Sequence, residues 1–299
     1  MLFAARFVLK ALTRLSVGCL TLRMPDGTEH VFGSKGAGPQ VRLDVTDPRF
    51  FRKVLLDGDI GFAEAYMDGY CDSPNLAALI ALLAENEKAL GSVAHTNSLH
   101  NLVLRLLHRW HDNSRSGSKR NIHAHYDLGN KFYSLWLDRT MTYSSALFGT
   151  EKSKPLESAQ TDKYERILEQ IGARQGDSIL EIGCGWGGFA ETAARRGMRV
   201  TAVTISKEQL EFARARLEHA GLADQVDLQF RDYRDIEGQY DHIVSIEMVE
   251  AVGERYWPDY FATLKKHVAP GGSALVQAIV IADDFYEAYR RRPDFIQTY

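Results

Sequence analysis

The fold of this chain depends on one stretch, Glu181-Ile182-Gly183-Cys184-Gly185-Trp186-Gly187-Gly188. An apolar segment over 178–182 predicts a strand before the glycines, and a helix is expected over 188–196. Glycines let the backbone turn sharply and approach a ligand closely, while the N-terminus of a helix presents unpaired N–H groups. The stretch therefore predicts a ligand cradle between a strand and a helix. A turn that only packs the two elements together is the alternative.

Strands and helices alternate through the second half of the chain. Strands are expected over 178–182, 199–204, 227–230, 242–246 and 273–281, and helices over 188–196, 207–220 and 256–266. Pro270-Gly271-Gly272 is a strong stop signal between the last helix and the last strand. This alternation predicts an α/β domain with a parallel, doubly wound, Rossmann-like sheet.

The first half has a different pattern. A hairpin is expected over 20–32, a strand over 41–45, and helices over 2–16, 50–56, 59–67 and 76–90. These elements predict a smaller α+β domain. Residues 111–119 are polar, basic and rich in serine and glycine, which is typical of a linker. We therefore expect one domain over 1–115 and a second over 116–299.

Apolar residues recur on one side of the expected helix over 2–16, and basic residues lie on the other. Two interpretations remain open. The helix either packs against its own domain or lies in the interface of a membrane. Four basic residues and no acid lie within 1–25, namely Arg6, Lys10, Arg14 and Arg23. Such residues would favour an anionic lipid surface.

Composition excludes several classes of protein. The net charge of −3 does not favour a nucleic-acid partner, and 45% hydrophobic with 25% charged residues is typical of a globular protein. Cys19, Cys71 and Cys184 are too scattered for a disulfide framework, which favours a cytoplasmic location. His123 and His125 have the wrong spacing for one helix face, and no metal site is expected.

Three features favour S-adenosylmethionine over a dinucleotide in the glycine cradle. Glu181 directly precedes the glycines, where a carboxylate can hold the ligand's amino group. No acid stands at the end of the second expected strand, whereas a dinucleotide site would place one there for the ribose. Tyr233 follows the third strand and offers a ring on which adenine can stack. The sequence therefore predicts a methyltransferase.

Several separated motifs resemble the cyclopropane-fatty-acyl-phospholipid synthases and the related mycolic acid and tuberculostearic-type fatty acid methyltransferases. They are the glycine stretch, Val203-Thr204-Ile205-Ser206 with Gln209, Asp232-Tyr233-Arg234-Asp235, His125-Tyr126-Asp127-Leu128-Gly129-Asn130 and Ala63-Glu64-Ala65-Tyr66-Met67-Asp68-Gly69. The resemblance begins near Gly61 and reaches the last residue. It implies a class I methyltransferase fold for the second domain and a lipid- or substrate-associated role for the first.

The resemblance also implies roles for individual residues. Cofactor contacts are expected from Tyr143, Ser144, Glu181, Gly183, Gly185, Gly187, Thr204, Ser206, Gln209, Asp232, Tyr233 and Arg234. Catalytic roles are expected from Glu250, which matches the family's active-site glutamate, and from Ser145, Gln277 and Tyr143. For Glu247, one helical turn earlier, we expect a helix-start or cofactor role.

Family members that make cyclopropanes often bind a bicarbonate ion through a cysteine, the glutamate, a histidine, a backbone group and a late tyrosine. Here Ser145 stands at the cysteine position, Gln277 at the histidine position, and Ala251 follows the glutamate. Serine and glutamine can still donate hydrogen bonds to an anion, but neither supplies an imidazole. The resemblance therefore implies an altered bicarbonate site.

The implied reaction alkylates a double bond. An alkene is a weak nucleophile that must be held in line with the sulfonium methyl group. The resulting carbocation is stabilised by aromatic faces and fixed negative charge. Glu250 is the candidate for the charge. Tyr143, Phe148, Tyr256 and Trp257 are candidate aromatic walls, with ordinary packing as the alternative for each. Proton loss gives either a cyclopropane or a methyl- or methylene-branched chain, and the sequence leaves both open. A methyltransferase for small polar metabolites and a non-catalytic lipid- or cofactor-binding protein are the alternatives.

The resemblance also implies partners. We expect an unsaturated phospholipid at a membrane surface as the substrate, with peripheral membrane association, and a homodimer remains open. Family members continue beyond the residues that match Phe295-Ile296-Gln297-Thr298-Tyr299. The sheet is therefore expected to lack its last two strands, with an exposed sheet edge as the consequence.

Overall fold

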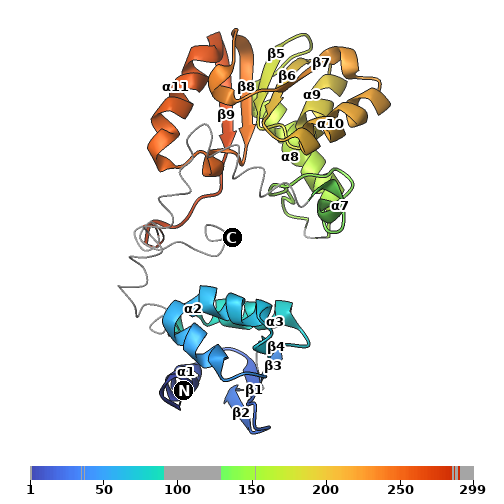
Figure 1. Cartoon of the computed structure of the whole chain (residues 1–299). Coiled ribbons are helices and arrows are strands. Elements are labelled where there is room, and N and C mark those ends of the chain that lie inside the picture. The colour runs from blue at the N-terminus through green and yellow to red at the C-terminus, as the bar shows by residue number, and fades with distance from the viewer. Residues whose placement is uncertain are drawn as a thin grey trace. The chain divides into compact units, whose positions relative to one another are not determined.

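The computed structural model describes residues 2–34, 36, 38–90, 129–151, 153–284, 286 and 289. They belong to two compact units, one drawn from residues 1–110 and 282–299 and the other from residues 111–281 (Figure 1). The expected domain boundary at 115/116, and His123 and His125, lie outside the described residues. Each unit has its own hydrophobic core, and each is described by itself.

The first unit is built on a four-stranded sheet in the order β2-β1-β3-β4. The strands are β1 (Cys19–Arg23), β2 (Glu29–Gly33), β3 (Gln40–Val45) and β4 (Cys71–Asp72). β1 pairs antiparallel with β2 and parallel with β3, so the predicted hairpin and third strand are confirmed. β4 was not predicted, because two residues carry no alternating pattern.

The helices of this unit are α1 (Leu2–Leu12), α2 (Arg49–Met67), α3 (Leu76–Glu85) and α4 (Glu87–Leu90). α2 is interrupted at Gly58, whose φ of 59° is non-helical, which confirms the two predicted segments. The single helix expected over 76–90 is instead divided at Asn86. The buried Asn86 amide accepts hydrogen bonds from the N–H groups of Ser16 and Val17 and donates to the carbonyl of Leu82.

The apolar side of α1 is used within its own unit. Ala4, Val8 and Leu12 are buried in the same core as the sheet residues Leu20 and Leu22. This burial confirms the packing interpretation of the helix. Among the described residues, no helix combines the length and hydropathy needed to cross a bilayer.

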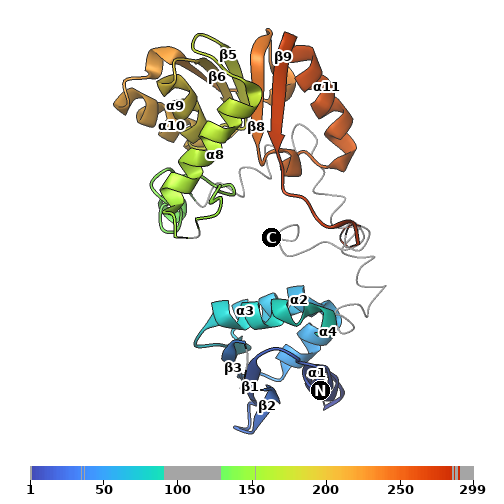
Figure 2. The same cartoon turned by 180° about the vertical axis from the view of Figure 1, so that it is seen from behind.

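The second unit contains a five-stranded parallel sheet in the order β7-β6-β5-β8-β9. Figure 2 labels β6, β5, β8 and β9 of this order. The strands are β5 (Ser178–Ile182), β6 (Arg199–Thr204), β7 (Val226–Phe230), β8 (Tyr240–Ile246) and β9 (Val268–Gln277). The predicted α/β class is confirmed. Strand order reverses between β5 and β8, and ligands of such sheets bind at the carboxyl ends of the strands beside this point.

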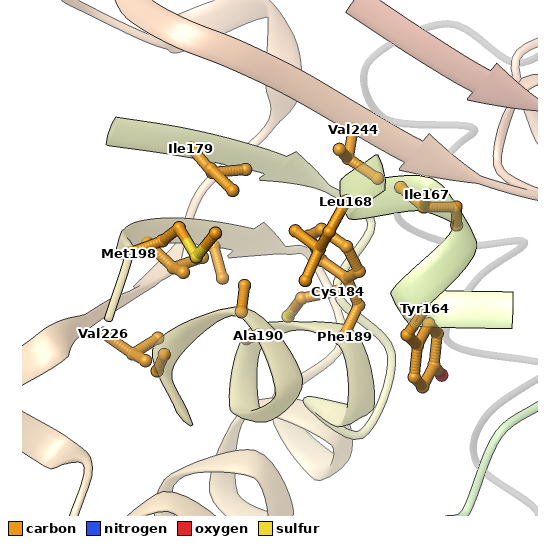
Figure 3. Close-up of a cluster of buried hydrophobic side chains, with 14 of the residues drawn as sticks. Tyr164, Ile167, Leu168, Ile179, Cys184, Phe189, Ala190, Met198, Val226 and Val244 are labelled. Carbon is orange, nitrogen blue, oxygen red and sulfur yellow. The ribbon is translucent and has the colours of Figure 1, made fainter. Parts of the chain in front are cut away.

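Helices cover both faces of this sheet. Residues of α8 (Leu156–Ile171), α9 (Gly188–Arg195) and α10 (Lys207–His219) share the core on one face, and those of α11 (Trp257–His267) share the core on the other. The unit also contains α7 (Gly129–Tyr133) and the 3₁₀ turns η2 (Ala223–Gln225), η3 (Tyr233–Asp235), η4 (Val249–Ala251) and η5 (Glu254–Tyr256). Ile179 of β5 packs in one core with Leu168 of α8 and Phe189 of α9 (Figure 3). Leu180, the next residue, packs in another with Tyr260 of α11. Successive residues of β5 therefore point to opposite faces of the sheet, and both faces are buried.

Two features of this unit differ from the prediction. α8 was not predicted from the sequence. β9 begins at Val268 and ends at Gln277, earlier than the strand expected over 273–281. Its first part includes Pro270-Gly271-Gly272, and the pairing with β8 is irregular there, since Tyr240 pairs with Val268 but His242 pairs with Ser273. A proline tolerated at an irregularity of the ladder explains the earlier start.

Candidate functional site

Three glycines of the loop after β5 adopt positive φ angles, 82° at Gly183, 51° at Gly185 and 82° at Gly187. A Cβ on Gly183 would lie 2.8 Å from Cγ of Met248, and one on Gly187 would lie 3.0 Å from Cβ of Ala213. A Cβ on Gly185 would meet nothing within 4 Å. Gly183 and Gly187 are therefore required by packing within the unit, whereas Gly185 borders open space that a ligand can enter.

The loop is fixed to the neighbouring strand. The N–H groups of Gly183 and Cys184 both donate to the carbonyl of Val203 on β6, at 3.0 and 3.1 Å. Cys184 is buried, and burial raises the pKa of its thiol well above its usual value. This environment favours a packing role for Cys184 and keeps the thiol protonated.

Glu181 is buried at the end of β5, with 3% of its surface exposed. Burial raises the pKa of its carboxyl to about 8, against the opposing effects of the Ala190 N–H, Arg216 and Lys163. Its Oε2 is buried and has no hydrogen-bond partner among the described residues. An unpaired carboxylate oxygen fits the predicted role of holding a ligand's amino group.

Thr204, Ser206 and Gln209 lie together after β6, as the prediction required, and all three are buried. The Ser206 hydroxyl caps α10 by accepting from the N–H of Gln209 at 3.3 Å. The Thr204 hydroxyl donates to Gln209 Oε1 at 3.1 Å and accepts from the N–H of Ser206 at 3.1 Å. These bonds fix the β6–α10 turn, and the last residue of β6 is Thr204 rather than an acid.

Asp232 and Arg234 form an ion pair after β7, with Arg234 Nη2 2.6 Å and Nε 2.8 Å from the carboxylate oxygens. The guanidinium also lies 5.5 Å from the centroid of the Tyr233 ring. Tyr233 contacts Tyr260 edge to face on the other side. The three predicted residues are therefore brought together, and the acid is already paired with its own arginine.

Four aromatic rings gather beside the glycine loop, and we call them the aromatic cluster: Tyr133, Trp136, Tyr143 and Trp186. Tyr133 lies 4.9 Å from Trp186 and 5.7 Å from Tyr143, and Trp136 lies 5.4 Å from Tyr143, all between ring centroids. Trp186 of the loop also donates to Asn130 Oδ1 at 2.6 Å. Trp136 and Tyr143 remain about half exposed. The cluster therefore presents exposed aromatic surface, and Trp186 joins it to the glycine loop.

The sequence found only part of this aromatic surface. Of the four predicted wall residues, Tyr143 alone belongs to the aromatic cluster. Tyr256 and Trp257 lie at the start of α11, and Phe148 lies on the chain before α8. Tyr133, Trp136 and Trp186 were missed as site residues. Trp186 stands inside the glycine stretch, which was the available signal.

A polar cluster joins three segments that are far apart in the sequence. Oε1 of Glu247 accepts hydrogen bonds from the N–H and the hydroxyl of Ser145, both at 2.9 Å, and from Nε2 of Gln277 at 2.9 Å. Gln277 Nε2 also lies 3.1 Å from the Ser145 hydroxyl. Ser145 and Gln277 are therefore brought together as predicted. Their shared carboxylate is Glu247, for which the expected helix-start or cofactor role stays a prediction.

Glu250 has a different hydrogen-bond partner from Glu247. It stands on η4 with an exposed side chain, and its Oε1 accepts from the N–H of Ile279 at 2.5 Å. Ser144 is bonded through its hydroxyl to Lys163 Nζ at 2.5 Å. Burial lowers the pKa of Lys163 to about 8. Two carboxylates and one buried amine thus lie near the ends of β8 and β9, and the described residues contain no cluster of metal ligands.

Comparison with known proteins gives one family match and several similar proteins. Residues 113–299 match the family described as mycolic acid cyclopropane synthetase. The tuberculostearic acid methyltransferase UfaA1 of Mycobacterium tuberculosis is 40% identical over 265 residues, which are 83% of this chain and 59% of that protein. The cyclopropane-fatty-acyl-phospholipid synthase of Escherichia coli is 37% identical over 242 residues, 79% of this chain and 60% of that protein. The chain thus spans about three fifths of the length of either relative.

A solved structure supports the same grouping. The mycolic acid cyclopropane synthase CmaA1, complexed with SAH and CTAB, superposes with a TM-score of 0.53 and 25% identity. The match covers 60% of this chain and 62% of that one. Together with the parallel sheet and its glycine loop, this likeness confirms the Rossmann-like class I methyltransferase fold.

Proposed function

Because the chain belongs to the mycolic acid cyclopropane synthetase family, we propose that it alkylates the double bond of an unsaturated fatty acyl chain. The observation that carries the proposal is the glycine loop, which is open at Gly185 and flanked by the aromatic cluster. A methyl donor can bind on one side of this arrangement while an apolar chain lies against the rings. No such apolar surface is needed for a small polar acceptor.

S-adenosylmethionine is the proposed methyl donor, and it supplies an electrophilic methyl group on a sulfonium. The loop from Gly183 to Gly187 would hold it, with the unpaired Oε2 of Glu181 as the acceptor for its amino group. Tyr233 offers a ring for the adenine. The bound SAH of the related synthase supports this choice, because SAH is the demethylated form of the same donor.

The aromatic cluster and the polar cluster have different proposed roles in the reaction. Methylation of an alkene leaves a positive charge on the acyl chain, and the faces of Tyr143 and Trp136 stabilise it. A carboxylate must then take a proton from the alkylated chain. Loss from the new methyl group closes a cyclopropane, and loss from the chain leaves a methylene branch.

An external bicarbonate, implied by the family resemblance, is not required by this proposal. Its expected donors, Ser145 and Gln277, are already bonded to Glu247. The N–H of Ile279 is bonded to Glu250. The residues present therefore do not fit a second anion while these bonds are made.

A phospholipid at a membrane surface is the proposed substrate. The name of the Escherichia coli relative supports this class, and Arg6, Lys10 and Arg14 would attract anionic headgroups. Peripheral association, a cytoplasmic location, a lipid-associated role for the first unit and a homodimer belong to the same proposal. Weaker binding to anionic vesicles in high salt is the expected behaviour.

The proposal is tested with purified protein, methyl-labelled S-adenosylmethionine and vesicles of unsaturated phospholipid. We expect label in the acyl chain, with a mass gain of one methylene group. Vesicles of saturated phospholipid are the control and should acquire no label. Label found only in a soluble polar acceptor would establish the small-metabolite alternative. Binding of the donor with no transfer to any acceptor would leave the non-catalytic alternative standing.

A further inference from the structure

Glu247 holds the position that an anion would take in this site. Its Oε1 is surrounded by three donors, the N–H and hydroxyl of Ser145 and the amide of Gln277, each at 2.9 Å. Its Oε2 makes no hydrogen bond to any described residue. One oxygen is therefore fixed, and the other is left to act on a substrate.

The backbone of Glu247 adopts an unusual conformation. Its φ is 48°, and Met141 is the only other described residue besides glycine with a positive φ. The N–H of Glu247 donates to the carbonyl of Gln277 at 2.8 Å, which ties the turn after β8 to the end of β9. A side chain held in this unfavourable region at a strand end is typical of functional sites.

Electrostatic repulsion disfavours the binding of a second anion beside the Glu247 carboxylate. A bicarbonate would have to displace the carboxylate from Ser145 and Gln277, or bind directly against it, and like charges at close range repel. Lys163, a cation of this region, is bonded to Ser144 and also interacts electrostatically with Glu247. The positive charge of this region is therefore shared with Glu247 already.

We propose that Glu247 is a built-in replacement for bicarbonate and acts as the base of the reaction. A C–H bond of the methylated carbocation breaks, and its proton passes to the Glu247 carboxylate. The electron pair of that bond forms the last C–C bond of a cyclopropane or a new C=C bond. The inference rests on the proposed alkylation of an acyl double bond. It identifies Glu247 as the base of that site and implies that the site needs no external bicarbonate.

The test compares wild type with Glu247→Gly and Glu247→Gln in buffers freed of carbon dioxide. Wild type should be equally active with and without added bicarbonate. Glu247→Gly relieves the φ strain, so the variant should fold. It also removes the carboxylate, so its activity should fall at least tenfold, and added bicarbonate should restore that activity. Glu247→Gln fills the same space with an amide and should stay inactive at every bicarbonate concentration. Glu211→Gln, an exposed change on α10, should behave as wild type.

Binding supplies a second readout that does not depend on turnover. Line broadening of ¹³C-bicarbonate in NMR should appear with Glu247→Gly and not with wild type. Wild type that binds bicarbonate, or loses activity without it, would overturn the inference, as would full activity of Glu247→Gly in its absence. Failure of the proposed function has a different signature, namely no lipid product from any variant, and the NMR comparison then still decides which anion holds the site.

Discussion

The glycine cradle and the polar cluster lie at the same edge of one sheet but are built in different ways. The cradle is local, since eight consecutive residues from the end of β5 to the start of α9 form it and hydrogen bonds to β6 fix it. The polar cluster joins Ser145, Glu247 and Gln277, which are separated by up to 132 residues. The cradle is mostly buried, whereas Ser145 is exposed and Glu247 and Gln277 are half-buried. The residues of the cradle are therefore required by packing, whereas those of the polar cluster are required by the proposed reaction.

The largest expected effect breaks the polar cluster without disturbing the cradle. Glu247→Gln should lower kcat by about 10²- to 10⁴-fold, the usual contribution of a general base. The free energy of unfolding should change by less than about 1 kcal/mol, because the side chain is half-buried and the amide can still accept hydrogen bonds. Steady-state kinetics and urea unfolding measure the two quantities. A stability loss as large as the activity loss would make Glu247 a structural residue instead.

The second prediction breaks the cradle. Gly187→Val forces a branched side chain against Ala213 at a φ of 82° and should destabilise the protein by roughly 3 kcal/mol, from strain and overpacking together. Gly185→Val meets open space, so it should cost only the backbone strain, about 1–2 kcal/mol. Both should weaken binding of S-adenosylmethionine. Calorimetric binding and urea unfolding check the pair, and equal stability losses would contradict the packing argument.

The third prediction concerns the aromatic cluster, which includes Trp186 of the cradle and Tyr143, two residues before Ser145 of the polar cluster. Tyr143→Leu keeps an apolar side chain but removes the ring face, and kcat should fall about five- to thirtyfold, equivalent to a cation–π contribution of about 1–2 kcal/mol. Binding of the donor should change less. Phe261→Leu, a similarly exposed ring on α11, is the matched control and should leave kcat unaltered. Equal effects of the two changes would remove the special role of the cluster.

The smallest expected effect is a pH dependence of the cradle. Burial raises the pKa of Glu181 to about 8, so the carboxyl is protonated at pH 6 in the ligand-free protein. A ligand ammonium favours the ionised form, so binding releases a proton, and affinity should rise by up to about tenfold from pH 6 to pH 7. Calorimetry in buffers of different ionisation enthalpy counts the proton. Glu181→Gln should abolish both the release and the slope, and a flat profile in wild type would contradict the assignment.

The local region was the part that sequence reasoning predicted well. β5 and β6 occupy the residues expected, because each is a short apolar run between turn-forming residues. The features that the sequence did not predict depend on tertiary contacts. Asn86 divides an expected helix because its amide binds the backbone of Ser16 and Val17, and no periodic pattern reveals that contact.

The polar cluster shows the same limit within the site. Ser145 and Gln277 were identified through a resemblance, but their partner depends on a turn at Glu247 with positive φ, which sequence patterns do not favour for glutamate. The available signal was its position directly after an expected strand, at the carboxyl edge of a parallel sheet. Domain boundaries, cofactor contacts and the lipid partner stay predictions.

Asn86 also has a consequence for how the first unit folds. Its side chain joins positions 69 and 70 residues apart, so these hydrogen bonds can form only after a long loop has closed. The amide protons of Ser16 and Val17 lie outside any helix or strand, yet they should exchange with solvent as slowly as those of the central strands. Their exchange rates would report the separation of the helices from the sheet. These two amides therefore measure how cooperatively the first unit unfolds.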